Sequence, residues 1–167
     1  MHFEIFVEDI SGKKLLEILV PKIICSSNSF DIHHYKGIGK IPNDLHSSPD
    51  PKKRLLLNKL PAILRAYGKG TNPKDLSIIV VVDCDKRNCR IFKQELISVL
   101  ESWEKLADIT LSRTAAKYLK SAAYPEIGKQ KTEWAQRIGS YMDINNNASP
   151  SFNCFKQKLE ELAKKRK

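Results

Sequence analysis

The run Ser77–Val82 (SIIVVV) constrains the fold more than any other segment of the chain. It is continuously apolar after its first residue and rich in β-branched side chains, without the polar alternation of a strand that has one wet face. A short run of this kind is typical of a strand buried on both faces of a parallel sheet. We therefore expect an α/β protein in which helices cover both faces of the sheet.

Two further strands and three helices are predicted in the first 100 residues. Residues 2–7 (HFEIFV) and Ser29–Tyr35 (SFDIHHY) alternate polar and apolar side chains, which predicts strands. Apolar residues at helical spacing predict helices up to about residue 23, over Lys52–Tyr67 and over Arg90–Leu100. The resulting order β-α-β-α-β-α predicts a parallel sheet with 77–82 central or beside 2–7.

The rest of the chain is expected to be helical and to contain no strand. Helices are predicted near 113–122, 130–142 and 150–165. The predicted domains are therefore an α/β domain over 1–100 and a helical C-terminal region over 101–167. An α/β domain of this kind usually continues into a fourth strand after its third helix. The missing strand predicts a deletion or a break in the chain near 100–103.

Several residues carry expectations of their own. Ser11 is predicted to cap the first helix and Ser149 the last, because a serine hydroxyl can accept from the free N–H groups at a helix start. Pro61 is predicted to interrupt the second helix, since proline lacks a backbone donor. Trp103 and Trp134 fall at helical spacing with other apolar residues and are predicted to lie in the core.

The charge of the chain favours a partner that carries phosphates. There are 29 Lys and Arg residues against 19 Asp and Glu, a net charge of +10. No apolar run approaches the roughly 18 residues of a membrane-spanning helix, so no membrane partner is expected. Glu4 stands where a signal peptide would carry basic residues, which favours a cytoplasmic location. The irregular spacing of the four cysteines is typical of reduced thiols.

Acidic residues follow two of the predicted strands. Glu8 comes directly after the first strand, and Asp83 and Asp85 come after the third. Ligands of open parallel sheets bind outside the carboxyl ends of the strands, where these carboxylates are expected to meet. Carboxylate oxygens suit Mg²⁺ (or Mn²⁺), which would act on a phosphate. The alternative is that the two aspartates only form a turn or cap a helix.

Basic residues in two segments are candidates for nucleic-acid binding. The segments are Ser11–Lys14 at a helix start and the glycine-containing turn Lys36–Lys40, and both also fit ordinary structural roles. Since His33 and His34 alternate across a strand, at most one is expected to face the crevice. The predicted nucleic-acid-binding residues are Lys13, Lys14, Lys36, Lys40 and Lys131.

Several motifs along the chain resemble those of a known family. An acid after the first strand and Asp-x-Asp after the third are similar to the TOPRIM pattern of topoisomerases, primases and OLD-family nucleases. The finer resemblance is to a bacterial TOPRIM-like family of unknown function, often encoded beside ABC-type ATPases in phage-defence operons. The motifs are Val7-Glu8-Asp9-x-Ser11-Gly12-Lys13, His34-Tyr35-Lys36-Gly37-Ile38-Gly39, Asp83-Cys84-Asp85, Trp103-Glu104-Lys105-Leu106-Ala107-Asp108, Lys131-x-x-Trp134-Ala135 and Ser149-Pro150-Ser151-Phe152.

The resemblance implies a function and a role for each matching acid. Glu8 would act as general acid/base or metal ligand, and Asp83 and Asp85 would hold Mg²⁺. The implied activity is a Mg²⁺-dependent nuclease acting on DNA or RNA under an ABC-type ATPase partner. The alternative is a non-catalytic basic subunit that binds nucleic acid or the ATPase. One departure is Asp9, where many TOPRIM domains have glycine, and another is the strand missing before Trp103.

Overall fold

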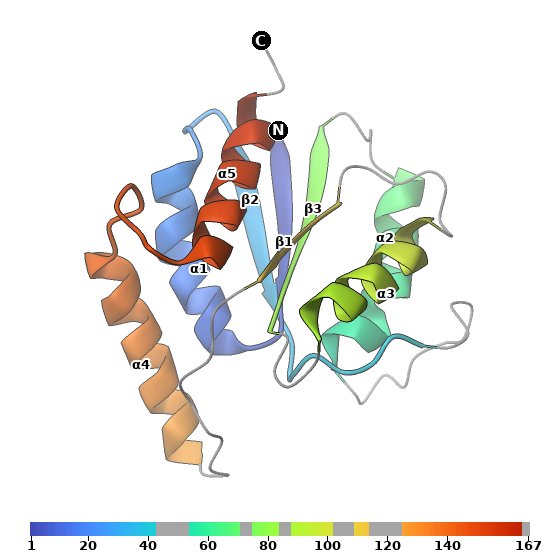
Figure 1. Ribbon diagram of the computed structural model, residues 1–167, viewed down its shortest axis with the longest axis horizontal. Helices are drawn as coiled ribbons and strands as arrows, with labels where there is room; N and C mark the ends of the chain where they lie inside the picture. The colour runs from blue at the N-terminus through green and yellow to red at the C-terminus, as the bar shows by residue number, and fades with distance from the viewer. Residues whose placement is uncertain (43–53, 71–74, 84–87, 102–108, 114–124, 165–167) are drawn as a thin grey trace.

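The centre of the molecule is a sheet of four parallel strands in the order β2-β1-β3-β4 (Figure 1). A computed structural model describes residues 1–42, 54–70, 75–83, 88–101, 109–113 and 125–164. The strands are β1 (His2–Val7), β2 (Ser29–His34), β3 (Leu76–Val82) and β4 (Ile109–Arg113). The predicted α/β fold is confirmed, and so is the parallel pairing of the third strand with the first.

Helices cover both faces of the sheet (Figure 1). One face is covered by α1 (Ile10–Ile23) and α5 (Pro150–Lys164), and the other by α2 (Leu56–Gly70) and α3 (Cys89–Glu101). The remaining helix, α4 (Pro125–Tyr141), packs on the outer side of α1. Among the described residues, no helix combines the length and the apolar character needed to cross a membrane.

The core consists of two layers, one on each side of the sheet. All seven residues of β3 are buried, and they alternate between the layers, which explains why their sequence is apolar throughout. Ile79 and Val81 pack with α1 and α5, whereas Ile78 and Val80 pack with α2 and α3. The strand predicted to be central therefore joins both layers.

The expectation of a strand-free C-terminal region is wrong. Residues 109–113 form β4, which pairs in parallel with β3 and supplies the strand that the α/β pattern requires after α3. The α5 residues Phe155, Leu159 and Leu162 lie in the same buried cluster as β1 and α1. The region beyond residue 100 thus completes the sheet and its core. The predicted break near 100–103 and helix near 113–122 lie mostly outside the described residues.

Local details correct three expectations and confirm one. Asp9, rather than Ser11, caps α1, because its carboxylate accepts from the Gly12 N–H at 2.6 Å. Helix α2 continues through Pro61, held by apolar residues buried against the sheet. Trp134 is 48% exposed on α4 instead of lying in the core. Ser149 caps α5 as predicted, with its hydroxyl accepting from the Phe152 N–H at 3.3 Å.

Candidate functional site at the carboxyl edge of the sheet

The strand order places a topological switch point between β1 and β3. From β1 the chain crosses through α1 to β2 on one side, and from β2 it crosses through α2 to β3 on the other. Helices α1 and α3, which follow β1 and β3 in the sequence, lie on opposite faces of the sheet. In open parallel sheets, ligands bind at such a topological switch point.

Two of the three predicted acids lie at this point. Glu8 directly follows β1 and Asp83 directly follows β3, and both are half-buried. The Glu8 Oε2 atom accepts a long hydrogen bond of 3.5 Å from the backbone N–H of Asp83. Asp85, the third predicted acid, lies outside the described residues. The structure therefore brings the Glu8 carboxylate to the Asp83 backbone, while the meeting of the carboxylates themselves stays a prediction.

Backbone hydrogen bonds hold Glu8 between the end of β1 and the start of α1. The Glu8 carbonyl accepts from the Gly37 N–H at 2.8 Å. The next residue, Asp9, caps α1 and also accepts from the Ser11 hydroxyl at 2.6 Å. Because both neighbouring segments are tied down, the Glu8 side chain is presented from a fixed backbone.

The basic turn after β2 is docked onto the start of α2. The carbonyls of Gly37 and Ile38 accept from the first N–H groups of α2, at Leu56 (3.0 Å) and Leu57 (2.8 Å). Such groups have no partner within their own helix, so the turn acts as the cap of α2. Gly37 and Gly39 have φ angles of 121° and 73°, in the region that favours glycine.

A cationic pocket of about 450 Å³ lies beside this turn, at the end of the edge strand β2. Lys13, Arg54 and Lys59 contribute the charges, and none of the lining residues in the described part of the chain is acidic. Burial raises the pKa of Tyr35, and the nearby Arg54 charge only partly opposes this effect. The Tyr35 phenol therefore stays protonated and able to donate. The lining residues are Lys13, Ile32, His33, His34, Tyr35, Arg54, Lys59, Ala62 and Ile63.

Two neighbouring histidines of β2 contribute to this pocket. Both His33 and His34 line it, although they belong to opposite faces of β2. This is possible because β2 is the edge strand: no further strand lies beside it, so a pocket at its end can reach side chains from both faces of the sheet. Arg54 and Lys59 were not predicted as binding residues. The basic character of the segment that contains them was the only available signal.

The other predicted lysines differ in their surroundings. Lys14 is paired with Glu17 on α1, at 2.8 Å, and Lys13 lies 3.7 Å from the same carboxylate. Lys36 and Lys40 are exposed in the turn. Lys131 is on α4, a separate element that packs against α1, and does not line the pocket. Of the five predicted lysines, Lys13 is the one that the structure brings into the pocket.

Comparisons with known proteins add no assignment to this geometry. No protein-family model matches the chain, and no curated protein matches it either.

Proposed function

We propose that this protein is a Mg²⁺-dependent nuclease of the cytoplasm that hydrolyses phosphodiester bonds in DNA or RNA. The observation that carries the proposal is the meeting of Glu8 with the Asp83 backbone at the β1–β3 switch point, next to a cationic pocket. Metal-assisted cleavage of a polyanion needs carboxylates for the metal and cations for the flanking phosphates. Both kinds of group are found at the same edge of the sheet.

The carboxylates and the cations would have separate roles. Glu8, Asp83 and Asp85 would hold Mg²⁺ (or Mn²⁺), because hard oxygen donors suit this ion. Bound there, the ion would stabilise the charge that develops on the reacting phosphate. Arg54 and Lys59 would bind a neighbouring phosphate of the strand, and the protonated Tyr35 phenol would donate to the same group.

The experiment measures cleavage of plasmid DNA and of single-stranded RNA by the purified chain, with Mg²⁺, with Mn²⁺ and with a chelator. The expected result is metal-dependent cleavage that Asp83→Asn abolishes, since asparagine keeps the shape and loses the charge. Asp143→Asn is the matched control, because Asp143 is an exposed loop residue that bonds only to nearby backbone N–H groups. Loss of cleavage in both variants, or in neither, would refute the assignment of Asp83.

The alternative function is a non-catalytic subunit that binds nucleic acid through the cationic pocket. The charged side chains among the described lining residues are cationic, which favours binding of a polyanion without chemistry. Binding that persists with every metal while no strand is cut would support this alternative. In either case, Arg54→Ala and Lys59→Ala should each lower the slope of log affinity against log salt by about 1, because each removes one phosphate contact.

The TOPRIM-like resemblance adds an ABC-type ATPase as the proposed partner. If an ATPase of this class encoded in the same operon controls cleavage, adding it with ATP should change the cleavage rate. An unchanged rate, together with no binding between the two proteins, would remove the ATPase from the proposal.

A further inference from the structure

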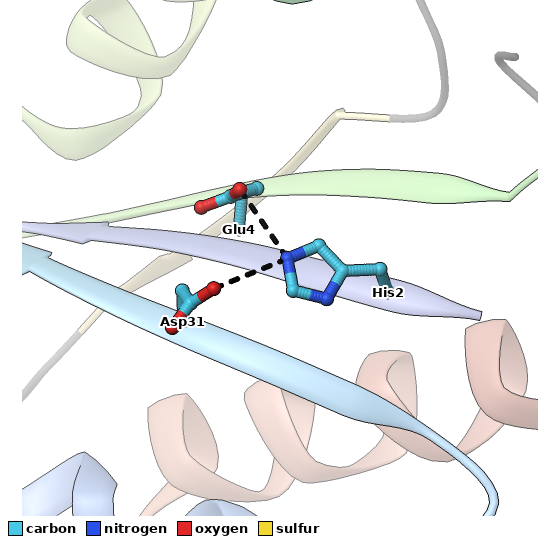
Figure 2. Close-up of side chains that lie close together, drawn as sticks. All are labelled: His2, Glu4 and Asp31. Atoms are coloured by element: carbon cyan, nitrogen blue, oxygen red, sulfur yellow. Dashed lines mark hydrogen bonds and ion pairs between the residues drawn. The ribbon is translucent and has the colours of Figure 1, made fainter. Parts of the chain in front are cut away.

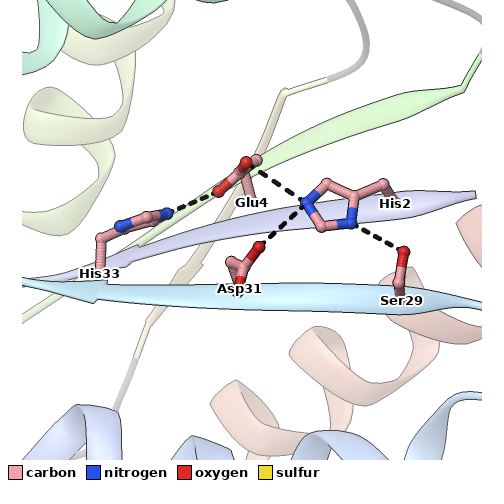
Figure 3. A network of polar contacts seen from close by, with 5 residues as sticks. All are labelled: His2, Glu4, Ser29, Asp31 and His33. Carbon is pink, nitrogen blue, oxygen red and sulfur yellow. Dashed lines mark hydrogen bonds and ion pairs between the residues drawn. The ribbon is translucent and has the colours of Figure 1, made fainter.

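A polar network crosses the β1–β2 half of the sheet (Figure 3). It lies on the face away from α5, which is the face that α2 and α3 cover. On this face the edge strand β2 carries polar side chains and no buried apolar ones. The pairing register places His2 beside Ser29 and Glu4 beside Asp31. Successive residues of one strand face are two apart, so the members of the network line up. They are His2, Glu4, Ser29, Asp31 and His33.

Three side chains of this network converge on one point (Figure 2). The His2 Nε2 atom lies 3.3 Å from Glu4 Oε1 and 3.5 Å from Asp31 Oδ2. Two ligand atoms that each lie about 2.1 Å from a tetrahedral ion are about 3.4 Å apart. The ligand atoms of His2, Glu4 and Asp31 lie within 4.8 Å of one another. Only a small inward movement is therefore needed for all three to reach a shared ion.

Further contacts orient these three side chains. The Ser29 hydroxyl bonds to His2 Nδ1 at 2.8 Å, and His33 Nε2 bonds to Glu4 Oε2 at 2.6 Å. The Tyr67 phenol also donates a hydrogen bond to the Glu4 carboxylate. Ordered partners behind the ligands are a regular feature of protein metal sites.

We propose that His2, Glu4 and Asp31 form a binding site for a divalent transition ion, with Zn²⁺ as the best fit. Imidazole nitrogen favours zinc over Mg²⁺, and one histidine with two carboxylates leaves a fourth position for water. With the ion bound, the Nε2 lone pair of His2 would face the metal and the ring proton on Nδ1 would donate to Ser29.

The site is separate from the proposed nuclease centre. Glu4 lies within the extended strand β1 and Glu8 directly follows it, four residues later, which places their backbones about 13 Å apart. The ligands come from β1 and from the edge strand β2, so the ion would join these two strands. Zinc binding here depends on neither Glu8 nor Asp83.

The test is a calorimetric Zn²⁺ titration of the full chain carrying Glu8→Gln and Asp83→Asn, which removes the carboxylates of the other site. We expect one saturable site with one Zn²⁺ bound per chain. Adding Asp31→Asn should weaken the affinity by at least about 10-fold. Asp31 is an exposed side chain, so this substitution leaves the core intact.

Matched controls identify the ligands. Glu161→Gln alters an exposed carboxylate on α5, and His34→Gln alters a histidine on the opposite face of β2. Both should leave the zinc affinity unchanged, whereas His2→Gln should lower it as Asp31→Asn does. The proposal is overturned if no saturable zinc binding occurs, or if His2→Gln and Asp31→Asn bind zinc as tightly as the controls do. Far-ultraviolet circular dichroism confirms that each variant is folded.

Discussion

Glu4 and Glu8 carry the same side chain on the same segment of chain, yet their surroundings differ. Glu4 lies within β1 and is 8% exposed, with two histidines bonded or ion-paired to its carboxylate. Glu8 lies one residue beyond the strand, half-buried, at the switch point between β1 and β3. A carboxylate inside a strand must find partners within the protein, whereas one at the strand end can bind a ligand from solvent.

Loss of activity should separate the two glutamates most strongly. Glu8→Gln is expected to lower metal-dependent cleavage by at least about 100-fold, because one carboxylate charge at the metal is lost. Cleavage rates at saturating Mg²⁺ measure the effect, and Glu133→Gln, on an exposed part of α4, is the control. Full activity in Glu8→Gln would exclude Glu8 from the catalytic centre.

Loss of stability should mark Glu4 instead. Glu4→Ala leaves His33 and Tyr67 without the acceptor that they now share, which should lower the free energy of unfolding by about 1–3 kcal/mol. Asp31→Ala, at an exposed residue of the same network, should cost no more than about 0.5 kcal/mol without added metal. Urea denaturation measures both. Equal costs would mean that the buried contacts of Glu4 contribute nothing beyond those of an exposed acid.

The turn beside Glu8 should depend on its glycines. Gly39→Ala should cost about 1–3 kcal/mol, because φ is +73° and the added Cβ would collide with Leu55 and Asn58. Gly128→Ala is the matched control, since a Cβ on this helical residue meets nothing within 4 Å. That change should stabilise the protein by about 0.5–1 kcal/mol. Similar effects of both substitutions on thermal unfolding would show that the turn tolerates other conformations.

The smallest expected effect concerns pH at the pocket. The pKa of Tyr35 is raised above 10.0 by burial, so folding favours the protonated phenol. Its contribution to stability is complete below pH 10 and is lost as the pH rises through the higher folded value. Between about pH 8 and pH 11, the free energy of unfolding measured by denaturation should therefore decline less for Tyr35→Phe than for the unaltered chain. An identical decline would mean that the phenol ionises as easily in the folded state.

Local patterns in the sequence predicted most of the sheet. The alternation in 2–7 and the continuous apolar run in 77–82 indicate whether one or both faces of each strand are buried. Each residue's own polarity carries this information, so the sequence alone suffices to predict it. The placement of Glu8 and Asp83 followed from the same reasoning, because parallel strands end at one edge. The five residues of β4 were missed, since so short a segment carries too little pattern to be distinguished from its surroundings.

The sequence by itself determined the α/β class, the parallel order of the first three strands and the edge where the acids gather. Only the tertiary structure decided which distant side chains become neighbours. His2 and Asp31 look like ordinary polar residues of two alternating strands until the register of β1 against β2 brings them to 3.5 Å. The pocket likewise depends on β2 being the edge strand. Register and strand order are set by packing across the whole core, and no local pattern contains that information.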